Sequence, residues 1–335
     1  MANLVDHKVA VKVYHGYGHM HDLIVYGHVF KNRTIPRRRY TNNILSNIIH
    51  LLRIFFVSPL PGVKVQLEWE TQVIEAVSED DGFFKLEWAS LVRVPAGQHA
   101  VKVFAIDESG NKIACGLGTL MVPHVTQYGF ISDIDDTVLV SHSATIFKRL
   151  RVLFTKNPQT RSAFEEVSAH YRMLSATHTT PDVPNPFFYV SSSEWNLYDD
   201  LVDFFRDKQL PEGAFLLSQV KKWYQLFKTG KTKHEGKLVR VYRIMKAFPK
   251  QKFVLLGDNS QSDPMIYEMI ARKYPERIVA IYIRNIVPAK EETTLGILKP
   301  LEKLGVSTCL FNSNLEAITH SRTTGLIQQP SNSSL

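Results

Sequence analysis

The chain has 335 residues, of which 44% are hydrophobic and 21% charged, a composition typical of a soluble globular protein with room for two domains. Its formal net charge of +8 favours anionic partners, a class that includes phosphorylated ligands, acidic lipid surfaces and nucleic acid. We expect no secretory signal, membrane span or disulfide framework, because no apolar run is long enough and the two cysteines, Cys115 and Cys309, lie far apart in the sequence.

Residues 8–123 are rich in predicted β-strands, because short apolar segments alternate there with polar neighbours and turn residues. The clearest of these segments lie at 9–13, 23–26, 63–67 and 101–105. Turn chemistry separates them at Asp80-Asp81-Gly82 and over 107–111. Short strands joined by regular turns predict an all-β, sandwich-like domain over residues 1–124.

Residues 42–57 differ from the rest of this β-rich region. Their apolar residues recur at helical spacing, and the basic run Arg37-Arg38-Arg39 precedes them. One interpretation is a helix that packs on the sandwich. The other is a helix that lies on a membrane surface between basic residues.

From residue 128 onward, apolar strands alternate with longer helical segments. The strands are predicted at 128–132, 187–191, 214–217, 252–256, 278–283 and 308–311, and the helical segments include 160–174, 195–208, 237–248 and 264–273. This alternation predicts a parallel sheet with helices on both faces, over residues 125–324. The Ser- and Gln-rich residues 325–335 are expected to form a disordered tail.

The first of the predicted parallel strands ends in Asp133, Asp135 and Asp136, and Thr137 follows them. Carboxylates at the end of a buried strand repel one another unless a cation joins them. An aspartate at the strand end can attack phosphorus while its neighbours share Mg²⁺. The pattern therefore indicates phosphoryl transfer through an aspartyl-phosphate, and an acidic turn after a strand is the alternative.

Three further features lie at or beside the ends of predicted strands, where a doubly wound sheet binds its ligands. The predicted strand 187–191 ends in the run Ser191-Ser192-Ser193, whose hydroxyls suit phosphate oxygens or, alternatively, a helix N-cap. Lys237 opens a predicted helix, where its charge is unfavourable unless an anion is bound, and a solvated lysine is the alternative. The strand before Gly257-Asp258 presents a further carboxylate, and Asp263 follows; both suit Mg²⁺, directly or through water.

Together these features resemble the haloacid dehalogenase-like phosphatase superfamily and, more closely, the catalytic domain of phosphatidate phosphatases of the actin-patch-protein type. The similarity covers roughly residues 125–290. It is carried by the segments 131–137, 188–193, Lys237-Leu238, 257–258 with 261–267, and 281–284. The resemblance implies a Rossmann-like α/β catalytic domain behind the all-β domain, and Mg²⁺-dependent hydrolysis of phosphatidic acid to diacylglycerol.

The resemblance also implies a role for each matching residue. Asp133 is the nucleophile, and Asp135 is the acid/base that protonates the leaving oxygen and then activates water. Lys237 offsets the carboxylate charge and holds the phosphoryl oxygens together with Thr137, Ser191 and Ser192. The Mg²⁺ ligands are Asp133, the backbone carbonyl of Asp135, Asp258 and, in a supporting role, Asp263.

The sequence departs from the family pattern at three places, none of which removes a catalytic group. Asn259-Ser260 stands where the family usually has Ser-Gly, Glu194 where it has Pro, and Ser218-Gln219 where a basic residue is expected. These departures concern contacts with the substrate head group, so they bear on which phosphomonoester is hydrolysed.

Two runs mix basic with apolar or aromatic residues, at 146–161 and 221–233. They suit a lipid phosphate in a bilayer, whereas a solvated amphipathic helix and a single-stranded nucleic acid site are the alternatives. We expect a cytoplasmic enzyme, peripheral at the membrane surface, that acts on an anionic phospholipid and binds no nucleic acid. A phosphatase for a soluble phosphomonoester and a non-catalytic phosphatidate-binding module are the competing hypotheses.

Overall fold

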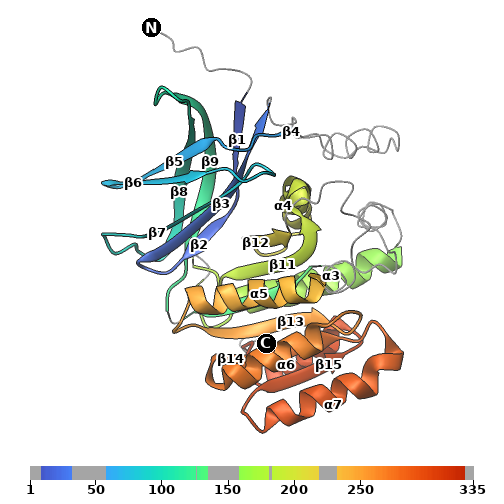
Figure 1. The fold of residues 1–335 in the computed structure, drawn as a ribbon. Helices are drawn as coiled ribbons and strands as arrows, with labels where there is room; N and C mark the ends of the chain where they lie inside the picture. Colours follow the sequence, from blue (N-terminus) through green and yellow to red (C-terminus); the bar gives the residue numbers. More distant parts are fainter. Residues whose placement is uncertain are drawn as a thin grey trace. The chain divides into compact units, whose positions relative to one another are not determined.

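The computed structural model describes residues 9–31, 58–125, 127–134, 158–180, 183–218 and 232–328. The chain divides into two compact units, of which the first contains residues 1–124 together with Glu194–Leu201, and the second most of the remainder. In Figure 1 the strands of the first unit are drawn in blue to green. The predictions for 42–57 and for most of the two basic runs fall outside the described residues.

The first unit is a β-structure whose described strands form one hydrogen-bonded sheet of nine strands. The strands are β1 (Val9–Val13), β2 (Gly16–Gly18), β3 (Asp22–Lys31), β4 (Ser58–Pro59), β5 (Lys64–Trp69), β6 (Gln72–Val77), β7 (Phe83–Ala89), β8 (Gly97–Ile106) and β9 (Lys112–Val122). The predicted segments at 9–13, 23–26 and 101–105 lie in these strands, and the segment 63–67 lies in β5 except for its first residue. The β-rich character of this region is therefore confirmed.

The described strands of this unit are connected in one hydrogen-bonded ladder, and the sandwich-like packing of two layers stays a prediction. Strand β3 pairs with β1 and β2 along one edge and with β4 and β7 along the other. The short β2 then pairs in parallel with β9, so the ladder continues through β8 to β5 and β6. A three-residue strand thus joins what the sequence pattern predicts as two layers, and such a short strand has too few residues for a periodicity signal.

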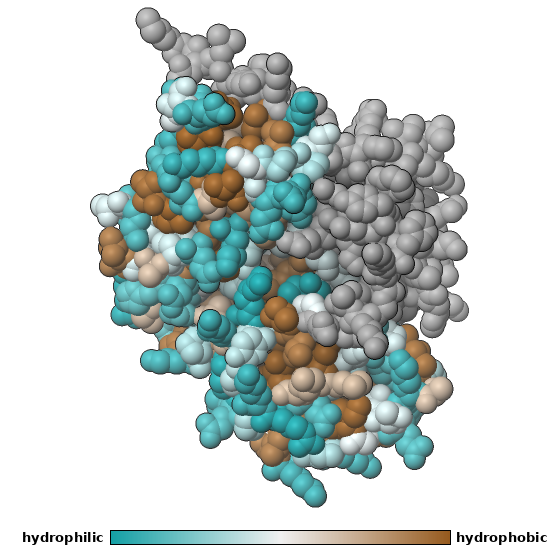
Figure 2. Space-filling model, in the orientation of Figure 1, coloured by the Kyte–Doolittle hydropathy of each residue, from teal (hydrophilic) through white to brown (hydrophobic). Residues whose placement is uncertain are grey.

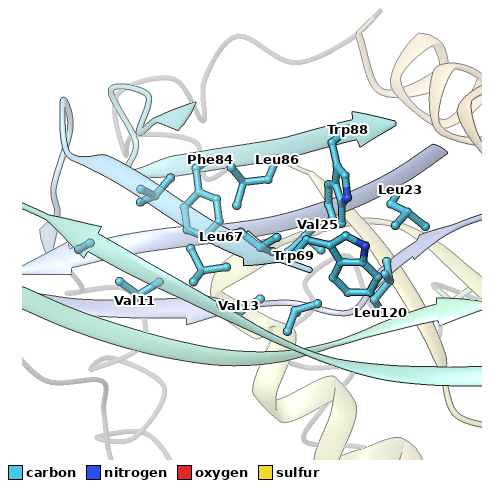
Figure 3. Close-up of a cluster of buried hydrophobic side chains, with 14 of the residues drawn as sticks. Val11, Val13, Leu23, Val25, Leu67, Trp69, Phe84, Leu86, Trp88 and Leu120 are labelled. Carbon is cyan, nitrogen blue, oxygen red and sulfur yellow. The ribbon is translucent and has the colours of Figure 1, made fainter. Parts of the chain in front are cut away.

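The core of this unit consists of buried apolar side chains that occupy alternate positions along strands such as β5 and β7. Figure 3 shows Leu67 and Trp69 of β5 near Phe84 and Trp88 of β7. The Trp69 and Trp88 rings meet edge to face, with centroids 5.5 Å apart, and the Trp69 indole N–H donates to Ser90 Oγ at 3.2 Å. Buried aromatics of this kind bind the strands through area burial and ring contacts.

The second unit is an α/β structure around a six-stranded sheet, with strand order β12-β11-β10-β13-β14-β15. Its strands are β10 (Tyr128–Asp133), β11 (Phe187–Glu194), β12 (Gly213–Ser218), β13 (Lys252–Asp258), β14 (Ile278–Arg284) and β15 (Ser307–Phe311). Its helices are α3 (Pro158–Ala176), α5 (Thr232–Ala247), α6 (Asp263–Lys273), α7 (Glu291–Glu302) and α8 (Asn314–Thr323). Helix α4 (Tyr198–Asp207) begins in the first unit and continues in the second from Val202 onward. The six predicted strands are all confirmed, with ends that differ by a few residues.

The sheet is doubly wound, because β10 pairs in parallel with both β11 and β13, and β13, β14 and β15 continue in parallel. Right-handed crossovers place α3 on one face and α5, α6 and α7 on the other. The contacts agree, since α6 touches both α5 and α7, whereas α3 touches α8. The chain changes direction between β10 and β13, and the carboxyl ends of strands at such a switch point form the usual ligand site of an open α/β sheet.

The predicted tail begins later than residue 325. Leu326 and Ile327 are buried, and the Thr177 hydroxyl donates to the Leu326 carbonyl. The Ile327 N–H donates to the Ser321 carbonyl at 3.0 Å, which continues the structure beyond α8. Two apolar residues after Gly325 thus extend the folded unit, because their burial offsets the cost of ordering the backbone.

The surface in Figure 2 mixes hydrophobic with hydrophilic residues over the described part of the visible face. Exposed large apolar residues of the first unit include Leu91 and Leu117. Among the described residues, no helix is both long and apolar enough to cross a membrane.

Candidate active site

Three buried carboxylates meet at the switch point of the parallel sheet. Asp133 ends β10, Asp258 ends β13, and Asp263 begins α6. All three side chains are fully buried, and one ligand oxygen from each lies within 4.8 Å of the others. Hard oxygen donors in this arrangement fit Mg²⁺ or another oxygen-preferring divalent cation.

Lys237 lies against this cluster and is itself buried. Its Nζ is 2.8 Å from Asp133 Oδ1 and also pairs with Asp263 Oδ1. Helix α5 begins at Thr232 rather than at Lys237, so the prediction that Lys237 opens the helix is wrong. The helix dipole therefore does not explain this residue, whereas two ion pairs to buried carboxylates do.

The electrostatics of the cluster couple these groups. Burial acts to lower the pKa of Lys237, but the charges of Asp133 and Asp263 outweigh it and hold that pKa well above its ordinary value. Burial also raises the pKa of Asp263 to about 6, with Asp258 adding to the rise and Lys237 opposing it. Lys237 offsets one of three negative charges, so the cluster retains a net attraction for a divalent cation.

Asp263 also supports the end of β13. Its Oδ2 accepts a hydrogen bond from the backbone N–H of Asp258 at 3.2 Å. This approach requires Gly257, because a Cβ at that position would lie 2.6 Å from the same oxygen and 2.8 Å from the Tyr267 ring. Gly257 thus permits a close approach of the backbone to these two neighbours.

Ser191 lies beside the end of β10, the strand that carries Asp133. Asp133 and Val190 are direct neighbours in the β10–β11 ladder, and the Ile134 N–H donates to the Val190 carbonyl at 3.2 Å. Ser191 is the next residue of β11 and is fully buried, whereas Ser192 is partly buried. The sheet therefore brings Ser191 and Ser192 to the edge that carries Asp133. Asp135 and Thr137 lie outside the described residues.

The comparisons with known proteins bear on this same region. Residues 128–285 match the family model described as phosphatidate phosphatase APP1, catalytic domain. The predicted resemblance to the catalytic domain of phosphatidate phosphatases of the actin-patch-protein type is confirmed over these residues. Below, these residues are called the APP1-like domain.

Two curated relatives match beyond the family model. The chain is 32% identical over 189 residues to phosphatidate phosphatase APP1 of Saccharomyces cerevisiae. The aligned region covers 53% of this chain and 30% of that protein. It is 27% identical over 159 residues to an uncharacterized protein of Schizosaccharomyces pombe, covering 47% of this chain and 25% of that one. The chain thus spans less than a third of the length of these relatives.

Two solved structures illustrate the structural comparison. A carbohydrate acetylesterase from Xanthomonas citri aligns with 92% of this chain and 71% of its own, at 8% identity and a TM-score of 0.35. A bacterial immunoglobulin-like domain from the M. primoryensis ice-binding adhesin aligns with 36% of this chain and 99% of its own, at 12% identity and a TM-score of 0.19. These scores are too low to assign a fold or a function.

Asn259 follows Asp258 in the APP1-like domain, at a position where the family pattern usually has serine. Its Oδ1 accepts from the backbone N–H groups of Ile286 and Val287 at 2.7 and 2.8 Å. Its Nδ2 donates to Asn285 Oδ1 at 2.7 Å and to the Val287 carbonyl at 3.0 Å. This side chain therefore connects the loops after β13 and β14, and in these contacts it serves as a scaffold residue.

Two features near the site were missed by sequence reasoning. Arg284 ends β14, pairs in register with Asp258 and is buried, and burial lowers its pKa while the Tyr171, Glu166 and Asp258 charges oppose that change. The Ser132 hydroxyl donates to the Asp133 carbonyl at 2.9 Å and hydrogen-bonds Tyr171 OH at 2.7 Å. Arg284 stood in a recognised motif without a role, and its place at a strand end was the available signal.

Proposed function

We propose that this protein is a Mg²⁺-dependent phosphatase that hydrolyses phosphatidic acid, or a related phospholipid phosphomonoester, to diacylglycerol and inorganic phosphate. The observation that carries the proposal is the buried cluster of Asp133, Asp258 and Asp263 around Lys237, at the switch point of a parallel sheet. The sequence match of residues 128–285 to a phosphatidate phosphatase catalytic domain supports the same substrate class. The strand order also fits the haloacid dehalogenase-like fold, which we include in the proposal.

In the proposed reaction, a carboxylate oxygen of Asp133 attacks phosphorus while the bond from phosphorus to the lipid oxygen breaks. Asp135 gives its proton to that leaving oxygen, so diacylglycerol departs neutral. Asp135 then takes a proton from water, which attacks the phosphorus of the aspartyl-phosphate. Inorganic phosphate leaves, and the Asp133 carboxylate is regenerated.

The remaining residues of the site would bind the phosphoryl oxygens and the metal ion during these steps. Lys237 pairs with Asp133 before the reaction and would turn to the phosphoryl oxygens as negative charge moves there, together with Ser191, Ser192 and Thr137. Asp133, Asp258 and Asp263, with the Asp135 carbonyl, would hold Mg²⁺. When bound, the ion neutralises charge between an anionic nucleophile and an anionic phosphate.

The test is a side-by-side assay of phosphate release from the purified chain. Phosphatidic acid in mixed vesicles, a short-chain soluble phosphatidate, a sugar phosphate and a nucleotide are compared with Mg²⁺ and with excess chelator. We expect Mg²⁺-dependent release that is fastest from phosphatidate. Faster phosphate release from the sugar phosphate or the nucleotide would contradict the lipid substrate and support a phosphatase for soluble phosphomonoesters. Vesicle binding without phosphate release would instead support a non-catalytic phosphatidate-binding module.

The metal assignment has its own test in Asp258→Ala. Deleting this carboxylate should raise the Mg²⁺ concentration for half-maximal rate by about tenfold or more, because few protein groups would hold the ion. It should also reduce the rise in melting temperature that Mg²⁺ gives to the wild-type protein. Glu268→Ala, which removes a carboxylate paired with Arg272 on the outer side of α6, is the matched control. Full activity of the wild type after exhaustive chelation would contradict the assignment.

A further inference from the structure

Strand β14 has an arginine at each end, and the surroundings of the two differ. Arg277 precedes the strand at its amino end and is half-buried. Its Nε donates to the Gln251 carbonyl at 3.2 Å, and its Nη2 donates to the Met245 and Phe248 carbonyls at 2.9 and 2.5 Å. The guanidinium of Arg277 thus holds the segment between α5 and β13, which is a structural role.

Arg284, at the carboxyl end of the same strand, is buried more deeply, with an exposed fraction of 8%. Its Nη1 has no hydrogen-bond partner among the described residues. Burial of a guanidinium N–H without an acceptor is costly, and arginine is rarely buried unless it is paired. The position of Arg284 therefore calls for an acceptor that the described part of the chain does not supply.

Arg284 lies at the edge of the sheet that carries the carboxylate cluster. It pairs in register with Asp258 in the β13–β14 ladder, and residues paired in this way project from the same face of a sheet. The Asp258 carboxylate belongs to the cluster. The backbone of Arg284 is fixed there, because its carbonyl accepts from the Asn259 N–H at 3.0 Å. The cation thus extends from a rigid position beside the candidate active site.

The charges of the site favour a second cation for an anionic ligand. A phosphomonoester that enters meets three buried carboxylates, and the Lys237 ammonium is already engaged by Asp133 and Asp263. Additional positive charge therefore favours binding of a phosphoryl dianion. The planar guanidinium of arginine presents its N–H groups as a fork that matches two oxygens of a phosphate. Arg284 provides such a fork, with N–H capacity left on Nη1.

We propose that Arg284 is a further substrate-binding residue, whose guanidinium donates to a phosphoryl oxygen of the bound phosphomonoester and of the inorganic phosphate product. The inference rests on the proposed function for the identity of the substrate. The chemistry that Arg284 recognises is a tetrahedral oxyanion, which substrate and product share. Its contact adds to those proposed for Lys237, Ser191 and Ser192, and it acts on binding rather than on proton transfer.

The experiment compares the two ends of β14 in the full chain. Arg284→Met removes the charge and the fork but keeps an unbranched side chain, and Arg284→Lys keeps the charge without the fork. Arg277→Met is the matched control, since it truncates the arginine at the opposite end of the strand. For each variant we would measure the melting temperature against inorganic phosphate with Mg²⁺ in excess, using sodium chloride at equal ionic strength as reference. We would also measure kcat and KM on a soluble phosphatidate.

Arg284→Met should weaken the affinity for inorganic phosphate and raise KM, each by about tenfold or more, because a hydrogen bond to a charged group is lost. Its melting temperature without phosphate should hold or rise, since a buried cation without an acceptor is replaced by an apolar group. Arg284→Lys should give intermediate values. Arg277→Met should behave in the opposite way, with a lower melting temperature and a phosphate affinity within about twofold of the wild type.

An indirect effect through the metal ion is tested in the same variants. Arg284→Met should retain or enlarge the rise in melting temperature that Mg²⁺ gives, because a cation beside Asp258 opposes the binding of another cation. A smaller rise would mean that phosphate affinity is lost through the metal, and the direct contact would be wrong.

Unchanged phosphate affinity in Arg284→Met would overturn the inference, as would the absence of any phosphate-induced stabilisation in the wild type. A loss of phosphate affinity with an unchanged KM for phosphatidate would also overturn it, since substrate and product share the phosphoryl group. Inactivity of the wild type on every phosphomonoester would contradict the proposed function instead. Phosphate-induced stabilisation that depends on Arg284 would then still support the oxyanion contact.

Discussion

At the scale of single residues, Lys237 connects two of the three buried carboxylates and sets their charge balance. Its ammonium pairs with Asp133 and Asp263 at once, and all of these groups are shielded from water. A buried ion pair of this kind adds little net stability, yet removal of its cation would leave uncompensated charge. The arrangement places a positive charge beside the Asp133 carboxylate, which is the nucleophile in the proposed reaction.

Asp133→Asn tests this residue-scale account. Turnover should be abolished because an amide is a poor nucleophile toward phosphorus. The melting temperature should hold or rise, since one of three repelling carboxylates is neutralised and Lys237 keeps its partner in Asp263. Phosphate release and thermal unfolding are measured together, with the exposed Asp207→Asn as control. Appreciable hydrolysis by the folded variant would sink the aspartyl-phosphate mechanism.

At the scale of secondary-structure elements, the site depends on how the loops after β13 and β14 are joined. The Asn259 side chain makes four hydrogen bonds across these loops, two of them from backbone N–H groups. Asp258 precedes Asn259 directly, and the Asp258 carboxylate accepts from the Ser260 N–H at 2.6 Å. The position of the Asp258 carboxylate therefore follows from a polar connection between two neighbouring strands.

Asn259→Ala should lower the free energy of unfolding by roughly 2–4 kcal/mol, because buried backbone donors lose their acceptor. The exposed Asn312→Ala, which loses one hydrogen bond from Asn285, should cost less than about 1 kcal/mol. Urea unfolding of both variants measures the difference. Similar values for the two would show that the loops find other partners.

Helices α3 and α8 are joined by His170, whose ring nitrogen Nε2 lies 3.0 Å from Ser321 Oγ. Burial lowers the pKa of His170 to about 3, with a smaller contribution from His320. In the unfolded chain the His170 ring takes up a proton near pH 6.5, whereas in the folded protein the same ring stays neutral down to about pH 3. Stability should therefore fall as pH drops through this window, at up to about 1.4 kcal/mol per pH unit for this group.

His170→Asn should remove that contribution, so the slope of unfolding free energy against pH should be shallower between pH 6 and 5. Urea titrations at several pH values measure it. His28, whose pKa burial lowers to about 3, should still contribute its own slope in the variant. An unchanged slope in His170→Asn would show that the His170 ring is not buried in solution.

At the scale of the whole molecule, the excess of positive charge bears on how a lipid substrate is reached. The net charge of +8 exceeds what an Mg²⁺-phosphate site requires. The basic runs at 146–161 and 221–233 fall mostly outside the described residues, so their part in membrane binding stays a prediction. Each Lys or Arg near an acidic bilayer contributes about 1 kcal/mol to binding.

Replacement of five basic residues by Gln tests that prediction, at Lys148, Arg149, Arg151, Lys221 and Lys222. Turnover of phosphatidate in anionic vesicles should fall far more than turnover of a short-chain soluble phosphate, and the effect should weaken at high salt.

A charge-matched control replaces five exposed lysines of the β-structured unit, at Lys31, Lys64, Lys85, Lys102 and Lys112. Equal losses from both sets on vesicles would indicate that net charge alone matters. Equal losses on both substrates would place the first set in the active site.

Sequence alone determined the features that depend on neighbouring residues. Apolar runs that end in Asp133, Ser191 and Asp258 predicted the strands and the edge of the sheet where chemistry is placed, because strand burial and turn chemistry are local. Such patterns also separated the β-rich region from the α/β region. The same patterns predicted that α5 begins at Lys237 instead of Thr232, because residues 232–236 carry no apolar periodicity that would mark the first turn.

The tertiary structure decided which groups meet. Lys237 reaches Asp133 and Asp263 across 104 and 26 positions of the sequence, the differences 237 − 133 and 263 − 237, because the crossovers bring their strands and helices together. The link through β2, the Asn259 contacts and the stacking of Tyr14 on Trp195 are likewise long-range contacts. No periodicity encodes such contacts, since each depends on the positions of elements that only the packed core brings together.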